Sequence, residues 1–175
     1  MELKYSLTKS DYLTYQLFQA SQSKHLRKIK FITWFLIPLL YIAIGIIGLV
    51  NLIISIGGSI LWLIIFPYFT RWAIKNNYSK LIDEQLGDRT DKTSKISLED
   101  NKILISDETS ERKIDTSEVS DIFEIASHVF IRLQQGVSII LPKDKIAKES
   151  VASFVSALEN QTDINKTEML DWKWR

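Results

Sequence analysis

The sequence predicts a membrane α+β protein, in which a two-helix transmembrane hairpin precedes a cytoplasmic antiparallel β-meander with a C-terminal amphipathic helix. Three observations support this class. Residues 31–70 contain no Asp, Glu, Lys, Arg or His. Residues 93–142 contain short apolar segments with a two-residue alternation, separated by turn-forming residues. Residues 147–158 change to the spacing of one helical face.

The averages over the whole chain conceal this division. With 46% hydrophobic residues and a net charge of +1, the 175 residues have the composition of an ordinary soluble domain. All 22 basic and 21 acidic side chains nevertheless lie outside the uncharged run. The lack of cysteine excludes a disulfide scaffold and a thiolate zinc site, and two histidines are too few for a His-rich site. We therefore expect no metal and no cofactor.

Residues 1–29 form the predicted cytoplasmic N-terminal segment. Residues 3–7 alternate as a short strand, and Thr8-x-x-Asp11 resembles a capping box with Asp in place of Glu. Apolar side chains then follow at helical spacing over residues 13–20. The sequence leaves two alternatives for this amphipathic helix: it lies on the inner leaflet of the membrane, or it packs on the cytoplasmic domain.

Residues 30–72 form the predicted transmembrane hairpin, with spans at about 30–49 and 52–72. A span needs about 20 mostly apolar residues, so the uncharged run holds two spans and a short turn. Gly48 and Asn51 mark the turn, because an amide side chain is costly at mid-bilayer. One long buried helix of a soluble protein is the alternative, but such a helix keeps a polar face. A signal peptide does not fit an apolar run of this length.

The charges that flank the hairpin predict its orientation. Basic side chains precede the first span and follow the second, whereas the connecting turn has none. The positive-inside rule therefore places both termini in the cytoplasm. Aromatic side chains gather at the same inner ends, where amphipathic rings are favoured. The basic collar consists of Lys24, Arg27, Lys28, Lys30, Arg71, Lys75 and Lys80.

Small residues indicate how the two spans pack. Gly45 lies in the first span, and Ser55, Gly58 and Ser59 lie in the second. Small side chains let helix backbones approach closely inside a bilayer. We expect them to serve packing within the hairpin, with a homo-oligomer contact as the alternative. A channel or transporter usually shows ionisable groups at membrane depth, and these spans carry no Asp, Glu, Lys, Arg or His. Because there are two spans only, they could form a pore only by oligomerising.

Residues 73–92 form the predicted juxtamembrane helix and linker. The helix continues from the second span to Leu86, and Gly87 is its stop signal. The polar residues 88–93 then read as a short linker.

The predicted cytoplasmic domain spans residues 93–160 and begins with antiparallel strands. Pro142 ends the last strand, because proline cannot donate to a β-ladder. The helix at 147–158 covers the open end of the meander, since this buries both apolar faces at once. The expected strands are 96–98, 103–105, 112–116, 119–125, 129–133 and 137–141.

After the two N-terminal spans, five segments of the domain carry a resemblance to a known family: Ile96–Asn101, Ser117–Ile125, Val129–Leu133, Ile139–Lys143 and Val151–Leu158. The layout is similar to that of the YcxB-like bacterial membrane proteins, and the resemblance covers nearly the whole chain except the tail, residues 161–175. It implies a pleckstrin-homology-like (PH-like) cytoplasmic domain, a location in the bacterial cell membrane, and no catalytic residue to carry over. The family often has an aromatic residue before the fourth strand, where this chain has Thr116-Ser117.

The sequence contains no catalytic motif. A Walker-type glycine loop is absent. His25 and His128 do not have metal-ligand spacing, and we expect each of them on the surface or in a turn. A Ser–His–Asp triad that uses His128 lacks the G-x-S-x-G elbow that would support it. We therefore expect no enzymatic activity and assign no catalytic or metal-binding residue.

Acidic residues gather between positions 107 and 124. We expect this acidic cluster to be the solvated face of strands and turns, with docking of a basic partner as the alternative. Nucleic acid is not an expected partner, because residues 71–175 carry a net charge of −3. The cluster consists of Asp107, Glu108, Glu111, Asp115, Glu118, Asp121 and Glu124.

The end of the tail, Met169–Arg175, contains Trp172 and Trp174 together with Lys and Arg. Three interpretations stay open for it: a disordered end, insertion at the inner membrane interface, or docking onto the sheet.

These expectations describe a membrane-anchored, non-catalytic binding module, for which the sequence assigns no ligand-binding residue. The expected partners are the lipid bilayer, a protein or peptide that contacts the cytoplasmic domain, and a second copy of the chain in a homo-oligomer. The resemblance adds one alternative function, immunity against a membrane-active bacteriocin. A subunit of an oligomeric pore or a transporter accessory is the other alternative.

Overall fold

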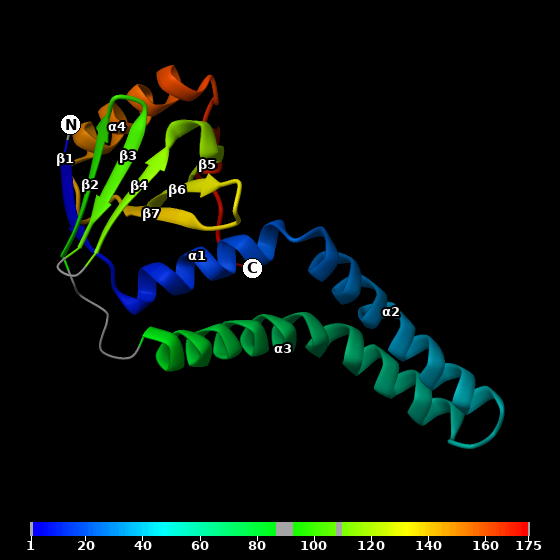
Figure 1. Ribbon diagram of the computed structural model, residues 1–175. Helices are drawn as coiled ribbons and strands as arrows, with labels where there is room; N and C mark the ends of the chain where they lie inside the picture. The colour runs from blue at the N-terminus through cyan, green and yellow to red at the C-terminus, as the bar shows by residue number, and fades with distance from the viewer. Residues whose placement is uncertain (1, 87–92, 108–109, 175) are drawn as a thin grey trace. The chain divides into compact units, whose positions relative to one another are not determined.

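A computed structural model describes residues 2–86, 93–107 and 110–174 of the chain. These residues form two compact units. The first unit, Met1–Tyr15 with Ile82–Lys173, contains two four-stranded sheets and the C-terminal helix. The second unit, Gln16–Leu81 with Trp174–Arg175, contains the two long apolar helices (Figure 1). The predicted α+β class is confirmed at this level. Residues 88–92 of the linker predicted at 88–93 lie outside the described residues, and Thr93 begins a strand.

The first sheet is antiparallel throughout, in the order β1-β2-β3-β4. Alternation places Ile96 and Ile103 on its buried face, with no exposed surface on either side chain. Asp100 and Asn101 form the two-residue turn between β2 and β3, both with positive φ, which is the geometry that matches strand twist in a tight hairpin. The strands are β1 (Glu2–Ser6), β2 (Thr93–Glu99), β3 (Lys102–Ser106) and β4 (Glu111–Asp115).

Strand β1 pairs with β2 although the two apolar helices lie between these strands in the sequence. Leu3 is opposite Ile96, and Lys4 is opposite Lys95. The sequence predicted a strand at 3–7 but assigned it to a separate N-terminal segment. The structure places it in the domain because Leu3 and Tyr5 alternate inward and are both buried. The chain therefore enters the apolar hairpin after one strand of this sheet and, after leaving it, forms the neighbouring strand.

The second sheet has the order β7-β6-β5-β8. A short 3₁₀ turn, Thr116–Glu118, separates it from β4, so the predicted meander is divided between two sheets. Pro142 is the last residue of its strand, as predicted. The sequence did not predict β8, which runs parallel to β5. The strands are β5 (Val119–Glu124), β6 (His128–Leu133), β7 (Ser138–Pro142) and β8 (Thr167–Glu168).

Helix α4, Lys148–Thr162, completes the core of this unit. Its apolar face contributes Phe154 and Leu158, which are fully buried, together with Val151 and Val155. These side chains belong to one cluster with buried residues of both sheets. Burying each such side chain stabilises the fold by about 1.5–3 kcal/mol. The predicted role of this helix in closing the apolar faces of the strands is thus confirmed.

Helix α1, Lys9–Gln22, begins with one half of the predicted capping box, in which the Asp11 carboxylate reaches back to the Thr8 amide. The Thr8 amide and hydroxyl both donate to Oδ2 of Asp11, at 2.7 and 2.8 Å. Within the first unit, Tyr15 then packs on the second sheet: its hydroxyl donates to Ser138 Oγ at 2.8 Å, and its ring centroid is 5.4 Å from that of Phe130. Of the two alternatives for this helix, packing on the domain holds for its first half.

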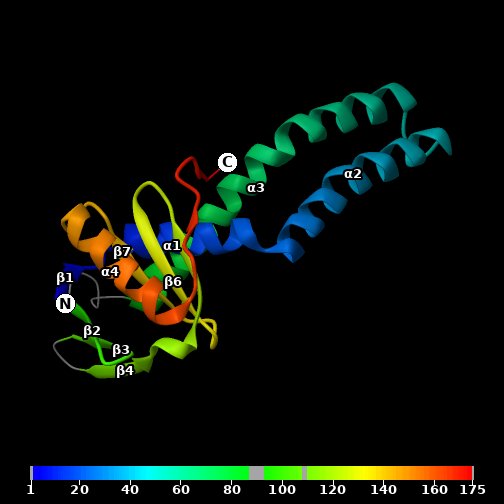
Figure 2. The same cartoon turned by 90° about the horizontal axis from the view of Figure 1, so that it is seen from above.

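The second unit contains α2, Lys24–Ile46, and α3, Leu52–Leu86, which run side by side (Figures 1 and 2). Both are long and apolar enough to cross a membrane by length and composition. Helix α3 ends at Leu86, as predicted, and α2 begins several residues before the predicted span because Ser23 caps it. Large apolar side chains on both helices are exposed, as in Leu39 at 67% and Ile53 at 80%.

Small and polar residues hold α2 and α3 together. A Cβ atom added at Gly45 would lie 2.5 Å from Ser55 Oγ, so the helix backbones are in close approach there. The Ser59 hydroxyl lies 3.1 Å from the Pro38 carbonyl oxygen, and the Trp34 indole donates to the Leu63 carbonyl at 2.9 Å. The small residues thus serve packing within the hairpin, which is one of the two uses predicted for them.

We expect Gly45→Ala to destabilise the packed helices by about 1–3 kcal/mol, because the new methyl group must displace Ser55 and the α3 backbone. Gly57→Ala is the matched control, since no atom lies within 4 Å of its added Cβ and alanine favours a helix. The measurement is unfolding of the full chain in mixed detergent micelles, followed by tryptophan fluorescence. Equal stability of the two variants would contradict this packing.

Candidate binding groove and the buried Asp11 cluster

A buried polar cluster centres on the carboxylate of Asp11, in the first turn of α1. The Lys145 ammonium donates to its Oδ2 at 2.7 Å, and His128 Nε2 lies 3.0 Å from its Oδ1. Lys145 also donates to the Ser6 carbonyl at 3.1 Å. These contacts join the end of β1 and the start of α1 to the second sheet and to the loop that follows β7. The cluster therefore attaches residues 6–11 to the rest of the first unit.

His128 is the first residue of β6 and is 5% exposed. The expectation that it lies on the surface or in a turn was wrong, because its ring stacks on Phe130 and its Nε2 meets the Asp11 carboxylate. A histidine before an alternating strand gives no sequence signal of a partner 117 residues away. His25, in the first turn of α2, is exposed as expected.

The Asp11 carboxyl is strongly favoured in its ionised form. Burial alone would raise its pKa, but hydrogen bonds from Lys145, Thr8 and His128 outweigh burial and lower the pKa to about 2. Because an ionised carboxylate only accepts, His128 Nε2 carries the proton that points at it. The charge of Asp11 is thus balanced by an ammonium group and used for structure.

Ser127, His128 and Asp11 have the connectivity of a Ser–His–Asp triad. Ser127 Oγ lies 2.7 Å from His128 Nδ1, and Nε2 lies 3.0 Å from Asp11. In a working triad the carboxylate stabilises the imidazolium that forms during the reaction. Here Lys145 already occupies that carboxylate, which weakens this stabilisation. The arrangement fits a structural network better than nucleophilic catalysis.

A groove of about 340 Å³ lies between β5, β6, α4 and the tail of the chain. We call it the Glu124 groove, after the acidic residue at its polar end. Lys143 and Lys166 pair with Glu124 at that end, and Lys148 also lines the groove. The rest of the lining is apolar, and it consists of Ala126, Val129, Val151, Ala152, Val155 and Leu170. The groove therefore combines a charged end with an apolar floor, as ligand sites commonly do.

Glu124 is the electrostatic centre of this groove. Lys143 donates to its Oε1 at 2.6 Å and Lys166 donates to its Oε2 at 2.5 Å. Burial opposes ionisation, but the two ammonium groups outweigh it and lower the pKa of Glu124 below its usual range. The pKa of Lys166 is raised by hydrogen bonds to Glu124 and Glu168.

The expectation that the acidic cluster is a solvated face holds for some of its members only. Asp107, Glu111 and Asp115 are exposed, whereas the side chain of Glu124 is only 19% exposed and bridges two lysines. Asp121 pairs with Arg132 at 3.6 Å. Glu108 lies outside the described residues. Glu124 differs from the exposed members because Lys166 of the tail, 42 positions away in the sequence, binds its carboxylate.

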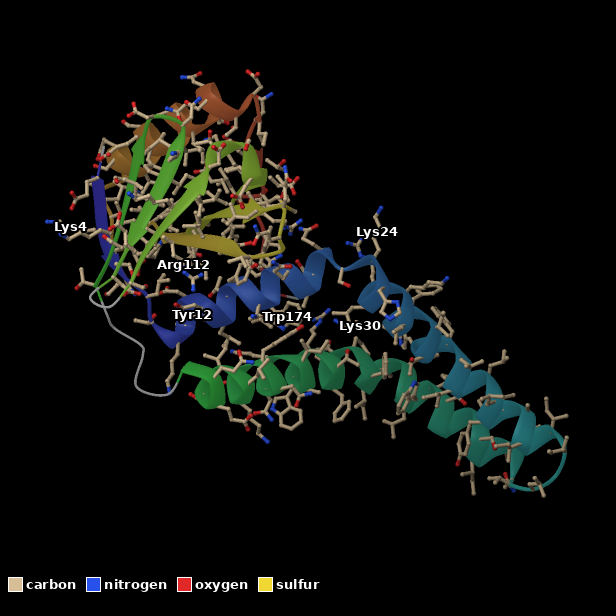
Figure 3. All side chains as sticks on the ribbon, in the orientation of Figure 1. Lys4, Tyr12, Lys24, Lys30, Arg112 and Trp174 are labelled. Atoms are coloured by element: carbon tan, nitrogen blue, oxygen red, sulfur yellow. The ribbon has the colours of Figure 1, made fainter. Side chains whose placement is uncertain are left out.

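The tail docks onto the second sheet over residues 167–169. Thr167 is opposite Phe123 in the parallel β8–β5 pairing, and the Met169 amide donates to the Glu124 carbonyl at 2.7 Å. Of the three interpretations, docking onto the sheet therefore holds for this part. In the second unit, the Lys30 ammonium lies 5.1 Å from the centroid of the Trp174 ring, and Figure 3 shows the two side chains facing each other.

A second groove, of about 270 Å³, opens between the inner faces of the two sheets. Tyr5 and Tyr12 line it together with Arg112 of β4, and Figure 3 labels the last two. Burial raises the pKa of both tyrosine hydroxyls, so they are neutral hydrogen-bonding groups. Its other lining residues are mostly aliphatic, which makes this groove an extension of the core.

Within the described residues, no group of three or more His, Asp or Glu side chains is placed to hold a metal ion. Comparisons with protein-family profiles, with curated proteins and with solved structures found no match. The candidate site is therefore described by its own geometry alone: the buried Asp11 cluster and the Glu124 groove with its charged end.

We expect Asp11→Asn to lower the free energy of unfolding by about 1–3 kcal/mol at pH 7, because Lys145 and His128 lose their ionised acceptor. The folded-state pKa of about 2 lies below the ordinary value of 3.8, so this stabilisation is complete above about pH 4 and is lost as the pH falls toward 2. Urea unfolding of the full chain in detergent micelles, at pH 7 and near pH 2, measures both effects.

Asp144→Asn is the control, because this neighbouring acidic residue is exposed. It should leave the stability unchanged at both pH values. A difference between wild type and Asp11→Asn that is equally large at both pH values would contradict the assigned role of the carboxylate.

Proposed function

We propose that this protein is a multi-pass protein of the bacterial cell membrane, in which the α2–α3 hairpin anchors a cytoplasmic, non-catalytic binding module. The observation that carries the proposal is the insertion of an uncharged apolar hairpin between two paired strands of one domain. The exposed apolar faces of both helices support a bilayer as their solvent, since such surface is rare on monomeric soluble proteins.

The pairing of β1 with β2 supports the predicted topology independently of charge. Strand β1 precedes the hairpin and β2 follows it, yet they lie side by side in one sheet. A sheet cannot form through a bilayer, so both strands must be on the same side of the membrane. This requires an even number of crossings, and two apolar helices supply it.

The basic collar supports placing that side in the cytoplasm. Lys24, Arg27 and Lys28 are exposed before the apolar part of α2, and Arg71 and Lys75 are exposed along α3. Exposed cations at these positions attract the anionic inner leaflet. The turn between the helices carries no charged side chain that would hinder its translocation across the membrane.

Binding is the activity that the domain supports best. The Glu124 groove offers a charged end and an apolar floor, whereas the Asp11 cluster is committed to structure. We further propose that the domain is PH-like, as the resemblance to YcxB-like proteins implies. Its two sheets and C-terminal helix support this proposal.

The topology is tested with single-cysteine variants, which are simple to make because the chain has no cysteine. Lys4 and Lys102 are exposed on the domain, and Leu49 is 74% exposed in the turn between α2 and α3. In spheroplasts, a membrane-impermeant maleimide should label Leu49→Cys. It should label Lys4→Cys and Lys102→Cys only after the membrane is disrupted.

Labelling of Lys4→Cys and Lys102→Cys from opposite sides of the membrane would contradict the proposal that both strands belong to one domain on one side. Labelling of both in intact spheroplasts, with Leu49→Cys protected, would contradict the orientation.

A further inference from the structure

The edge of β5 that faces away from β6 is covered by β8, which has two residues against the six of β5. On this edge, within the part of the chain that the structure describes, Thr167 and Glu168 pair with β5, and the Met169 amide adds one hydrogen bond to the Glu124 carbonyl. An open strand edge presents unpaired backbone groups and is a template for another strand. Residues 164–170, which we call the tail strand, therefore act as an added strand on an edge that would otherwise be free.

Two side chains of the tail strand fix its position in the Glu124 groove. Lys166 donates to the Glu124 carboxylate, and its backbone amide donates to Glu159 of α4 at 2.7 Å. Four residues later, Leu170 reaches the apolar floor next to α4. Backbone pairing thus supplies general affinity, while one cation and one apolar side chain supply selectivity.

The tail strand fills this site incompletely. Thr167 and Glu168 are exposed, and Leu170 remains 50% exposed although it lines an apolar groove. About 340 Å³ of the groove is left open beside it. Besides the ion pair of Lys166 and the amide hydrogen bonds of Lys166 and Met169, the attachment consists of two paired residues and one half-exposed leucine. A longer strand with a larger apolar side chain could therefore replace it.

We infer that the Glu124 groove is a strand-docking site for an extended segment of a partner protein that carries Lys or Arg and, four residues later, a large apolar side chain. The tail strand is its resident competitor. This inference rests on the proposed function as a binding module and names the chemistry of the partner. Glu124 selects the cation, and Val151 and Val155 of α4 receive the apolar side chain.

The test measures binding of a labelled peptide with the sequence of residues 164–174, by fluorescence anisotropy. The full chain and a chain that stops after Asp163 are compared in detergent micelles. We expect the shortened chain to bind the peptide at least about tenfold more tightly, because the attached tail strand competes at high effective concentration. A full chain with Lys166→Gln and Leu170→Ser, which loosens the tail strand at constant length, should bind like the shortened chain.

Peptide variants test the selectivity. Lys166→Glu in the peptide should weaken binding about tenfold or more, whereas Lys173→Glu, the same charge change outside the groove, should not. Glu124→Lys in the shortened chain should reverse this preference and restore binding of the Lys166→Glu peptide. Equal binding of all peptides, or no binding to a shortened chain that unfolds cooperatively, would overturn the inference.

Failure of this inference is distinguishable from failure of the proposed function. Insertion of the hairpin does not involve the Glu124 groove. Absence of peptide binding by a chain with correct topology contradicts only the strand-docking site, whereas a chain that does not enter the membrane contradicts the proposed function.

Discussion

The pairing of β1 with β2 is the constraint on which the rest of the structure depends. Five residue pairs join strands that the sequence separates by the whole apolar hairpin. The first sheet therefore contains strands from both sides of α2 and α3 in the sequence. Asp11 reinforces this closure directly after β1, because Lys145 binds both its carboxylate and the Ser6 carbonyl. Closing so long a loop costs entropy that grows only slowly with its length, and the buried residues Leu3 and Tyr5 offset it.

The two units differ in where their large apolar side chains lie. In the first unit, both sheets and α4 direct their apolar side chains into one shared core, and the charged residues remain at the surface or pair with each other. In the second unit, small residues bring the helices together and large apolar side chains face outward. A chain with a mean hydropathy near zero therefore combines a domain with a buried apolar core and two helices long and apolar enough to cross a membrane. The proposed function is based on that combination.

Elements with a strong local period were predictable from the sequence, whereas pairings over long distances were not. The alternation in β6 and the helical face of α4 were visible in the residues themselves. The partners of Asp11 were not, since His128 and Lys145 lie 117 and 134 positions away. Strand β8 has two polar residues and no period, so nothing in its sequence marks it. The candidate site was missed for the same reason: Glu124 belongs to an acidic run, and only the returning tail reveals it as a centre of charge.

The central claim is that strands before and after the apolar hairpin in the sequence pair within one domain while the hairpin sits in a bilayer. Disulfide formation in Lys4→Cys with Lys95→Cys, in protein reconstituted into lipid nanodiscs, tests it most directly, because these residues are opposite each other in β1 and β2. The account predicts nearly complete cross-linking. Lys4→Cys with Glu111→Cys, three strands away in the same sheet at about 14 Å, should not cross-link. Failure of the first pair to cross-link while the hairpin is inserted would contradict the account.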